Sequence, residues 1–191
     1  MFIDYVENIT HWESWQQSYR FGVLLIFPPD PPSSEVNNLR SQHDPQGQAI
    51  CQAHISLTVP LPKPINLAQL NELRTIASGI KPFLIHYGPL SNYLPAPGVV
   101  LAIQPQDKID GLRIALESAS AFEGVPVRKY PFSAHMTIAE FITVEKTMEL
   151  MTKLRGLVSE GDFMCDSVSY TVPDASFHFT ERLKLELEIG R

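Results

Sequence analysis

The feature that most constrains the fold of this chain is an order of elements that occurs twice along the sequence. Residues 52–59 and residues 133–139 alternate polar and apolar side chains, which predicts strands with one polar and one apolar face. A more uniformly apolar strand precedes each segment, and a helix with apolar residues at helical spacing follows it. This repeated order indicates an α+β fold. The stretch before the first alternating segment is expected to be mostly loop, with a short helix near residues 33–40.

Each alternating segment carries a histidine that is followed, two residues later, by a hydroxyl side chain. The pairs are His54 with Ser56 and His135 with Thr137. Side chains at i and i+2 of a strand project from the same face, about 6.6 Å apart. If the two halves of the chain face each other about a pseudo-twofold axis, the pairs meet and offer two imidazoles and two hydroxyls. A third His-x-Thr begins at His178, but charged residues and no helix follow it, so we interpret His178 as a surface residue.

The composition limits the partners of the chain. With 191 residues, of which 44% are hydrophobic and 19% charged, the chain has the size and composition of one folded domain. A net charge of −6 argues against an extended surface for duplex nucleic acid, whereas a small nucleotide or an RNA end needs only a local positive charge. The longest apolar run is far shorter than the ~20 residues that span a bilayer. Two cysteines without paired spacing indicate a reducing compartment. We therefore expect a cytoplasmic monomer without a membrane partner.

The motifs "HISL" and "HMTI" resemble the paired H-x-[ST]-φ signatures of the 2H phosphoesterase superfamily, and most of all its 2'-5' RNA ligase-like, or cyclic phosphodiesterase, branch. The early strand in "VLLIFPPDPPSSEV" and the order of elements extend the resemblance over nearly the whole chain, although the first motif has Ser where Thr is commoner. The resemblance implies one domain over residues 1–191, made of two pseudo-symmetric lobes. Two antiparallel-rich sheets would face a central groove, with the helices outside.

The resemblance also implies a substrate, a 2',3'-cyclic phosphate or a 2'-5' phosphodiester of RNA or nucleotides. A phosphodiester needs a base for the attacking oxygen, an acid for the leaving oxygen and donors for the phosphoryl oxygens. His54 and His135 would transfer the protons, and Ser56 and Thr137 would bind the non-bridging oxygens; the sequence leaves open which histidine is the acid. Reverse ligation of RNA ends is possible in principle. No metal or cofactor is expected, because no carboxylate or thiolate accompanies the histidines, His178 included, at the spacing of zinc ligands.

The segment just before the second motif contains four weaker candidates for substrate contacts. Arg128 and Lys129 could supply local positive charge, and Tyr130 or Phe132 could stack on a base. The alternative for these residues is a solvated basic pair beside core aromatics. Two other functions also stay open for the chain. It could be a catalytically weak module that binds nucleotides or RNA ends on the same fold, or a structural α+β domain in which the motifs are accidental.

Overall fold

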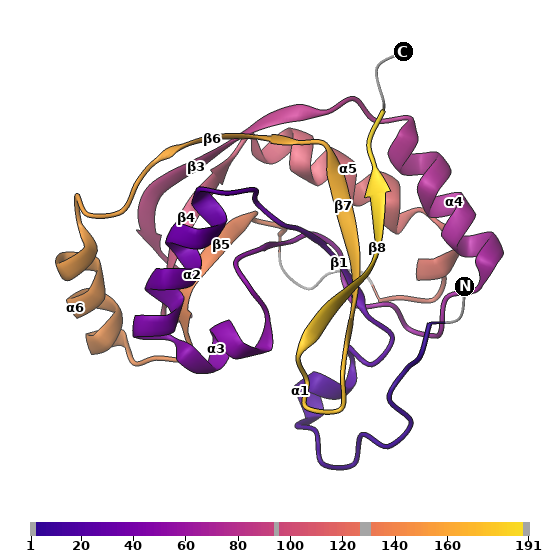
Figure 1. Ribbon diagram of the computed structural model, residues 1–191, viewed down its shortest axis with the longest axis horizontal. Helices are drawn as coiled ribbons and strands as arrows, with labels where there is room; N and C mark the ends of the chain where they lie inside the picture. The colour runs from indigo at the N-terminus through magenta and orange to yellow at the C-terminus, as the bar shows by residue number, and fades with distance from the viewer. Residues whose placement is uncertain (1–2, 94–95, 127–130, 189–191) are drawn as a thin grey trace.

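The computed structural model describes residues 3–93, 96–126 and 131–188 (Figure 1). Its α-helices are α1 (Ser14–Gln17), α2 (Pro32–His43), α3 (Pro45–Ile50), α4 (Leu67–Ser78), α5 (Gln106–Glu117) and α6 (Val144–Leu154), and a 3-10 turn covers Ser120–Phe122. Its strands are β1 (Val23–Ile26), β2 (Ile55–Ser56), β3 (Phe83–Asn92), β4 (Gly98–Gln104), β5 (His135–Glu140), β6 (Gly161–Cys165), β7 (Ser167–Pro173) and β8 (Phe179–Glu186). The α+β class predicted from the sequence is confirmed.

The strands form one curled antiparallel sheet in the order β6-β3-β4-β5-β2-β1-β7-β8 (Figure 1). The expected pair of sheets is therefore wrong for the described chain. The physical reason lies in β2, which uses both of its edges. Ile55 is aligned with Ile26 of β1 on one side and with Met136 of β5 on the other. Because β2 hydrogen-bonds to both neighbours, the strands of the two halves join into a continuous sheet.

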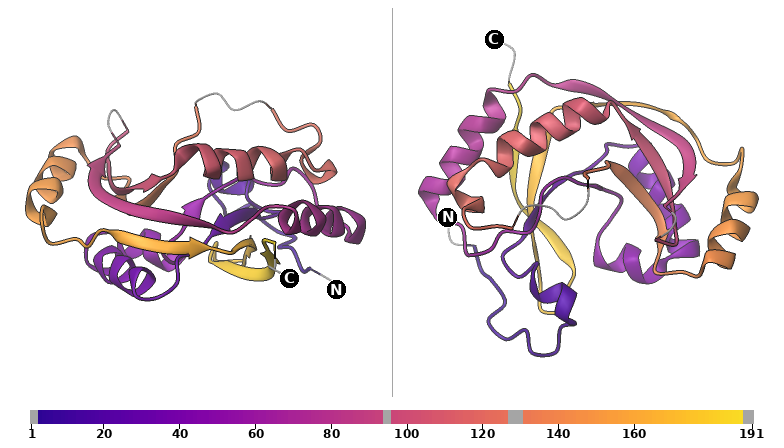
Figure 2. Two further views of the ribbon diagram at one scale, coloured as in Figure 1. Left: turned by 90° about the horizontal axis from the view of Figure 1, so that it is seen from above. Right: turned by 180° about the vertical axis from the view of Figure 1, so that it is seen from behind.

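The longer helices pack on one face of the curled sheet, because buried residues of α2, α4, α5 and α6 lie in the same apolar cluster as Ile55 and Met136. Figure 2 shows α4 beside α5 over one part of the sheet and α2 beside α3 over another. The capping residues expected from the sequence begin two of the helices: the side chain of Asn66 accepts the Gln69 amide before α4, and that of Thr143 accepts the Lys146 amide before α6. No helix among the described residues is long and apolar enough to cross a membrane.

The stretch before the first motif is helical, which corrects the expectation of a loop with one short helix. Residues 32–50 form α2 and α3, which meet at Asp44. The inward positions of α2 are Pro32, Val36 and Arg40. A proline and an arginine on the buried face hide the apolar stripe on which helix prediction depends.

The first motif strand is shorter at both ends than the expected segment 52–59, because β2 covers only Ile55–Ser56 and His54 directly precedes it. The amides of Leu57 and Thr58 both donate to the carbonyl of Leu24, at 3.2 and 3.3 Å. The hydroxyl of Thr58, which is 5% exposed, accepts the Leu24 amide at 3.2 Å. Thr58 therefore hydrogen-bonds to β1 just beyond the end of β2. Its buried hydroxyl does not extend the polar face of the motif.

Candidate functional site

The structure brings the two histidine motifs together on adjacent antiparallel strands. Ile55 of β2 is aligned with Met136 of β5. One step further in each direction, antiparallel geometry sets His54 opposite Thr137 and Ser56 opposite His135, and such opposed pairs have Cβ atoms about 4.5–5.5 Å apart. Ile55 and Met136 are fully buried on the other face. The four polar side chains therefore share one face, on which Ser56 is exposed and the other three are half-buried.

Each histidine is oriented by the same local hydrogen bond. The Nδ1 atom of His54 lies 2.7 Å from the carbonyl oxygen of Gln52, and that of His135 lies 2.8 Å from the carbonyl oxygen of Ser133. Because a carbonyl oxygen only accepts, Nδ1 carries the proton in both rings. Each neutral ring then keeps the lone pair on Nε2. The two imidazoles are therefore both prepared to accept or return a proton through Nε2.

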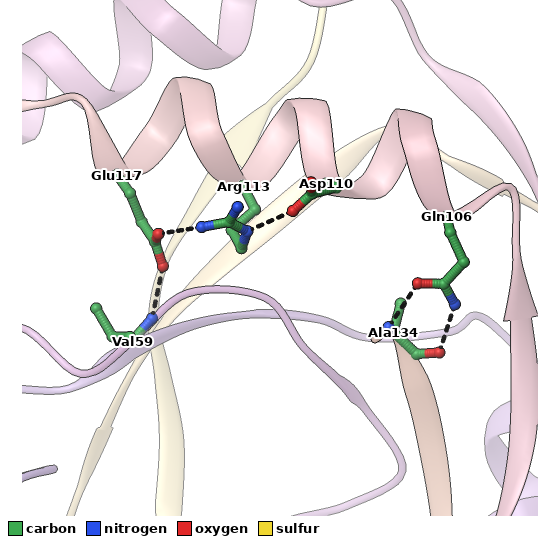
Figure 3. A network of polar contacts seen from close by, with 6 residues as sticks. All are labelled: Val59, Gln106, Asp110, Arg113, Glu117 and Ala134. Carbon is green, nitrogen blue, oxygen red and sulfur yellow. Dashed lines mark hydrogen bonds and ion pairs between the residues drawn. The ribbon is translucent and has the colours of Figure 1, made fainter. Parts of the chain in front are cut away.

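A carboxamide holds the residue before each histidine. The amide of Ala53 donates to Oδ1 of Asn37 on α2 at 2.7 Å. The amide of Ala134 donates to Oε1 of Gln106 on α5 at 2.8 Å, and Nε2 of Gln106 donates back to the Ala134 carbonyl at 2.8 Å (Figure 3). Both alanines are buried. The two motifs thus share their support as well as their sequence pattern.

Helix α5 fixes the backbone at both motifs. Gln106 at its first turn binds Ala134, and Glu117 at its last turn accepts the Val59 amide at 2.9 Å, just beyond the first motif (Figure 3). Arg113 lies between them and pairs with both Asp110 and Glu117 on the same helix. Because α5 is a rigid element of 12 residues, it sets where one motif strand leaves the site and where the other enters it.

Arg40 of α2 hydrogen-bonds to the backbone at both motifs. Its Nη1 atom donates to the Thr137 carbonyl at 2.9 Å, and its Nη2 atom donates to the Cys51 carbonyl at 3.3 Å. The side chain is only 2% exposed, and its Nε atom has no hydrogen-bond partner among the described residues. A buried guanidinium is costly to desolvate. Arg40 thus supplies a positive charge close to His54 as well as two hydrogen bonds to the backbone.

The surroundings of the histidines keep them neutral. Burial lowers the pKa of His54 from 6.5 to about 4; the positive charges of Arg40 and of a protonated His135 act in the same direction, and the hydrogen bond to the Gln52 carbonyl opposes them. Burial also lowers the pKa of His135, against the hydrogen bond to the Ser133 carbonyl. The larger shift is at His54. Both rings are therefore unprotonated at neutral pH in the free protein.

Three of the remaining sequence candidates, Arg128, Lys129 and Tyr130, lie outside the described residues. Phe132 is half-buried and packs against the core, with the Arg113 guanidinium 5.3 Å from its ring centroid.

His178 is exposed, as expected, and its Nδ1 atom lies 3.7 Å from a carboxylate oxygen of Asp174. Within the described ranges, no three His, Cys, Asp or Glu side chains are grouped closely enough to hold a metal ion.

An antiparallel sheet that presents two His and hydroxyl pairs from adjacent strands defines a two-histidine α+β protein. Residues 28–176 match the 2'-5' RNA ligase superfamily, and the chain belongs to this family, as the motifs predicted. A "Putative phosphoesterase" of Bacillus cytotoxicus is 28% identical over 134 residues, which cover 69% of this chain and 76% of that protein. A protein of the same name from Bacillus thuringiensis gives the same identity and coverage.

Solved structures share the fold at low sequence identity. Escherichia coli LigT in its apo form gives a TM-score of 0.56 at 16% identity, over 87% of this chain and 96% of LigT. LigT complexed with 3'-AMP gives a TM-score of 0.57 at 16% identity, over 86% of this chain and 96% of LigT. The same protein is also known complexed with ATP and with NADP+. The likeness establishes an α+β fold like that of LigT.

The residues that support the histidines were not predicted from the sequence. They lie on helices outside the two motifs, and their residue types are common on the exposed faces of helices: Asn37, Arg40 and Gln106. One signal was available, since the dipeptide Ala-His occurs in both motifs. A small residue at that position leaves room for a side chain to reach the backbone.

Proposed function

We propose that this chain is a metal-independent phosphodiesterase that hydrolyses 2',3'-cyclic phosphates or 2'-5' linkages of RNA or nucleotides. The observation that carries the proposal is the alignment of Ile55 with Met136, because this alignment sets two oriented imidazoles and two hydroxyls on one face. Family membership and the phosphoesterase names of the relatives support the same reaction class. The nucleotide complexes of LigT support a nucleotide as the ligand.

The proposed reaction uses the two histidines in turn. One Nε2 atom takes the proton of the attacking water, while the other, protonated, gives its proton to the leaving ribose oxygen. The hydroxyls of Ser56 and Thr137 donate to the non-bridging oxygens, where charge develops. The reverse sequence of proton transfers joins RNA ends, whereas a high concentration of water favours hydrolysis.

The pKa shifts support a division of roles between the histidines. The pKa of His54 is lowered to about 4, so its ring is the one that stays neutral and acts as the base. The pKa of His135 is lowered less. A bound phosphate carries negative charge, which favours the protonated form of a nearby imidazole. We therefore assign His135 as the acid that becomes protonated in the complex with substrate.

A second candidate is a nucleotide- or RNA-end-binding module that turns over slowly or not at all. The observation that favours it is the lowered pKa of both histidines, because the free protein then holds no protonated imidazole at neutral pH. The two candidates differ in one measurable property. The enzyme converts a bound cyclic phosphate into a monoester, and the module releases it unchanged.

The test is a product analysis with 2',3'-cyclic nucleotides and 2'-5' oligonucleotides, with and without a chelator. We expect hydrolysis that survives chelation, and a loss of roughly 10²–10⁴-fold in kcat for H54A and for H135A. H178A is the matched control, since it removes an exposed imidazole from outside the site. Full activity of both motif variants on every substrate would refute the assignment. Binding without product would favour the module, and loss of activity on chelation would refute the metal-independent reaction.

A further inference from the structure

Two exposed aromatic side chains meet beside the site. Phe141, which follows β5 directly, is 80% exposed, and Trp15 of α1 is 41% exposed. Their ring centroids are 5.9 Å apart with an angle of 34° between the planes. Phe141 also has a φ of +54°, a left-handed conformation that non-glycine residues rarely adopt. An exposed Phe in a strained conformation is a feature that folding alone does not explain.

Trp15 is held firmly from one side. Its indole Nε1 donates to a carboxylate oxygen of Glu13 at 2.8 Å. Tyr19 and Phe177 pack against it in edge-to-face geometry, with centroid distances of 6.3 and 5.3 Å. The indole is therefore a fixed platform, and Phe141 is the ring that faces it from the other side.

A run of aromatic rings connects this platform to the first motif. Tyr19 contacts Phe179 at 5.8 Å, and both rings pack with Phe27 in one apolar cluster. Phe27 in turn lies 6.4 Å from the ring of His54. On the other strand, Phe141 comes four residues after Thr137, a distance of about 13 Å along an extended strand. The pair thus lies at the edge of the candidate site, within reach of a ligand that extends from the phosphate position.

We propose that Trp15 and Phe141 form an aromatic clamp that takes the nucleobase of the substrate between their rings. Two intervals of about 3.4 Å come to about 7 Å, so the rings, at 5.9 Å and tilted by 34°, need to separate by about 1 Å and turn toward parallel. The carboxylate of Glu13, which accepts the hydrogen bond from the Trp15 indole, lies beside the pair; it disfavours a phosphate there and suits an uncharged base. The inference rests on the proposed function, because the base belongs to the same ligand.

The family match covers only one of the two rings of the clamp. The segment that matches the 2'-5' RNA ligase superfamily begins at residue 28, after α1 and Trp15. Since one ring lies outside that segment and the other inside it, the clamp adds a contact to the phosphate chemistry of the motifs. Its purpose is recognition of the base.

The test is a binding titration that needs no turnover. The chain has two tryptophans, and Trp12 is buried at 5% exposure, so quenching by a stacked base reports on Trp15. We expect adenosine 3'-monophosphate to quench the fluorescence, and ribose 5-phosphate and inorganic phosphate to leave it nearly unchanged. Calorimetry should give roughly 5- to 150-fold weaker binding of adenosine 3'-monophosphate for W15A and for F141A, with phosphate binding unchanged.

Two controls keep the outcome decisive. W15F retains a ring and should restore most of the affinity, whereas L157A removes a side chain that is 74% exposed elsewhere and should have no effect. Wild-type affinity for the nucleotide in both alanine variants would overturn the clamp, and so would an equal loss of phosphate binding. If no cyclic phosphate is hydrolysed but the base-dependent binding is present, the proposed hydrolase fails and the clamp stands.

Discussion

The lowered pKa of His54 makes a prediction about stability in acid. The pKa is 6.5 for an ordinary histidine and about 4 in the folded protein. Between these values the unfolded chain binds a proton that the folded chain excludes, so stability rises with pH in this window. The contribution is fully present above pH 6.5 and is lost as the pH falls toward 4. The difference corresponds to about 3 kcal/mol of unfolding free energy at pH 4.

The perturbation is H54Q, which removes the titrating group and keeps a polar side chain. Urea unfolding is followed by circular dichroism from pH 8 to pH 4, for the wild type, for H54Q and for H178Q. We expect the wild type to lose about 3 kcal/mol more than H54Q over this range. H178Q, which removes an exposed imidazole, should follow the wild type. Parallel curves for the wild type and H54Q would refute the reasoning, because they would mean that the fold does not exclude the proton from this ring.

Three further predictions follow from the geometry of the site. The pH optimum of kcat/KM should fall below 6.5, because burial lowers the pKa of both motif histidines in the free enzyme; an optimum at alkaline pH would contradict the assignment. Q106A leaves the carbonyl and amide of Ala134 unpaired, and should lower the unfolding free energy by about 2–4 kcal/mol in urea titrations and lower kcat as well. R40K cannot reach both the Thr137 and the Cys51 carbonyls, and should cost about 1–3 kcal/mol of stability while NMR titration still finds a low pKa for His54.

The sequence predicted those parts of the fold that depend on local patterns. Alternation at period two placed His135 and Thr137 on one face of β5, and capping residues marked the starts of α4 and α6. These features are local, because side-chain direction and cap geometry depend on a few neighbouring residues. The sequence led us to expect that the two motifs meet across a pseudo-twofold axis. In the structure they lie on adjacent, directly paired strands.

Other features depend on contacts that are distant in sequence. Whether the strands formed one sheet or two depended on how many neighbours β2 would have, and no pattern within residues 52–59 decides that. Arg40 was not predicted as a buried residue because an arginine on a helix is ordinarily exposed. Its burial depends on the Thr137 carbonyl, 97 positions away. The division of residues 1–191 into two lobes and the monomeric state stay predictions.

Two motifs with the same local design can still perform different steps, because their surroundings differ. Both histidines are oriented by a carbonyl two residues earlier. Burial is the largest cause of the lowered pKa of His54, and the positive charge of Arg40 lowers it further. His135 instead lies 4.5 Å from the ring of Tyr93, whose side chain is 40% exposed. A cation beside one imidazole and an aromatic ring beside the other favour the neutral form of the first over that of the second. In the proposed reaction, the repeated motif therefore supplies the geometry, and the residues that differ around it favour His54 as the base and His135 as the acid.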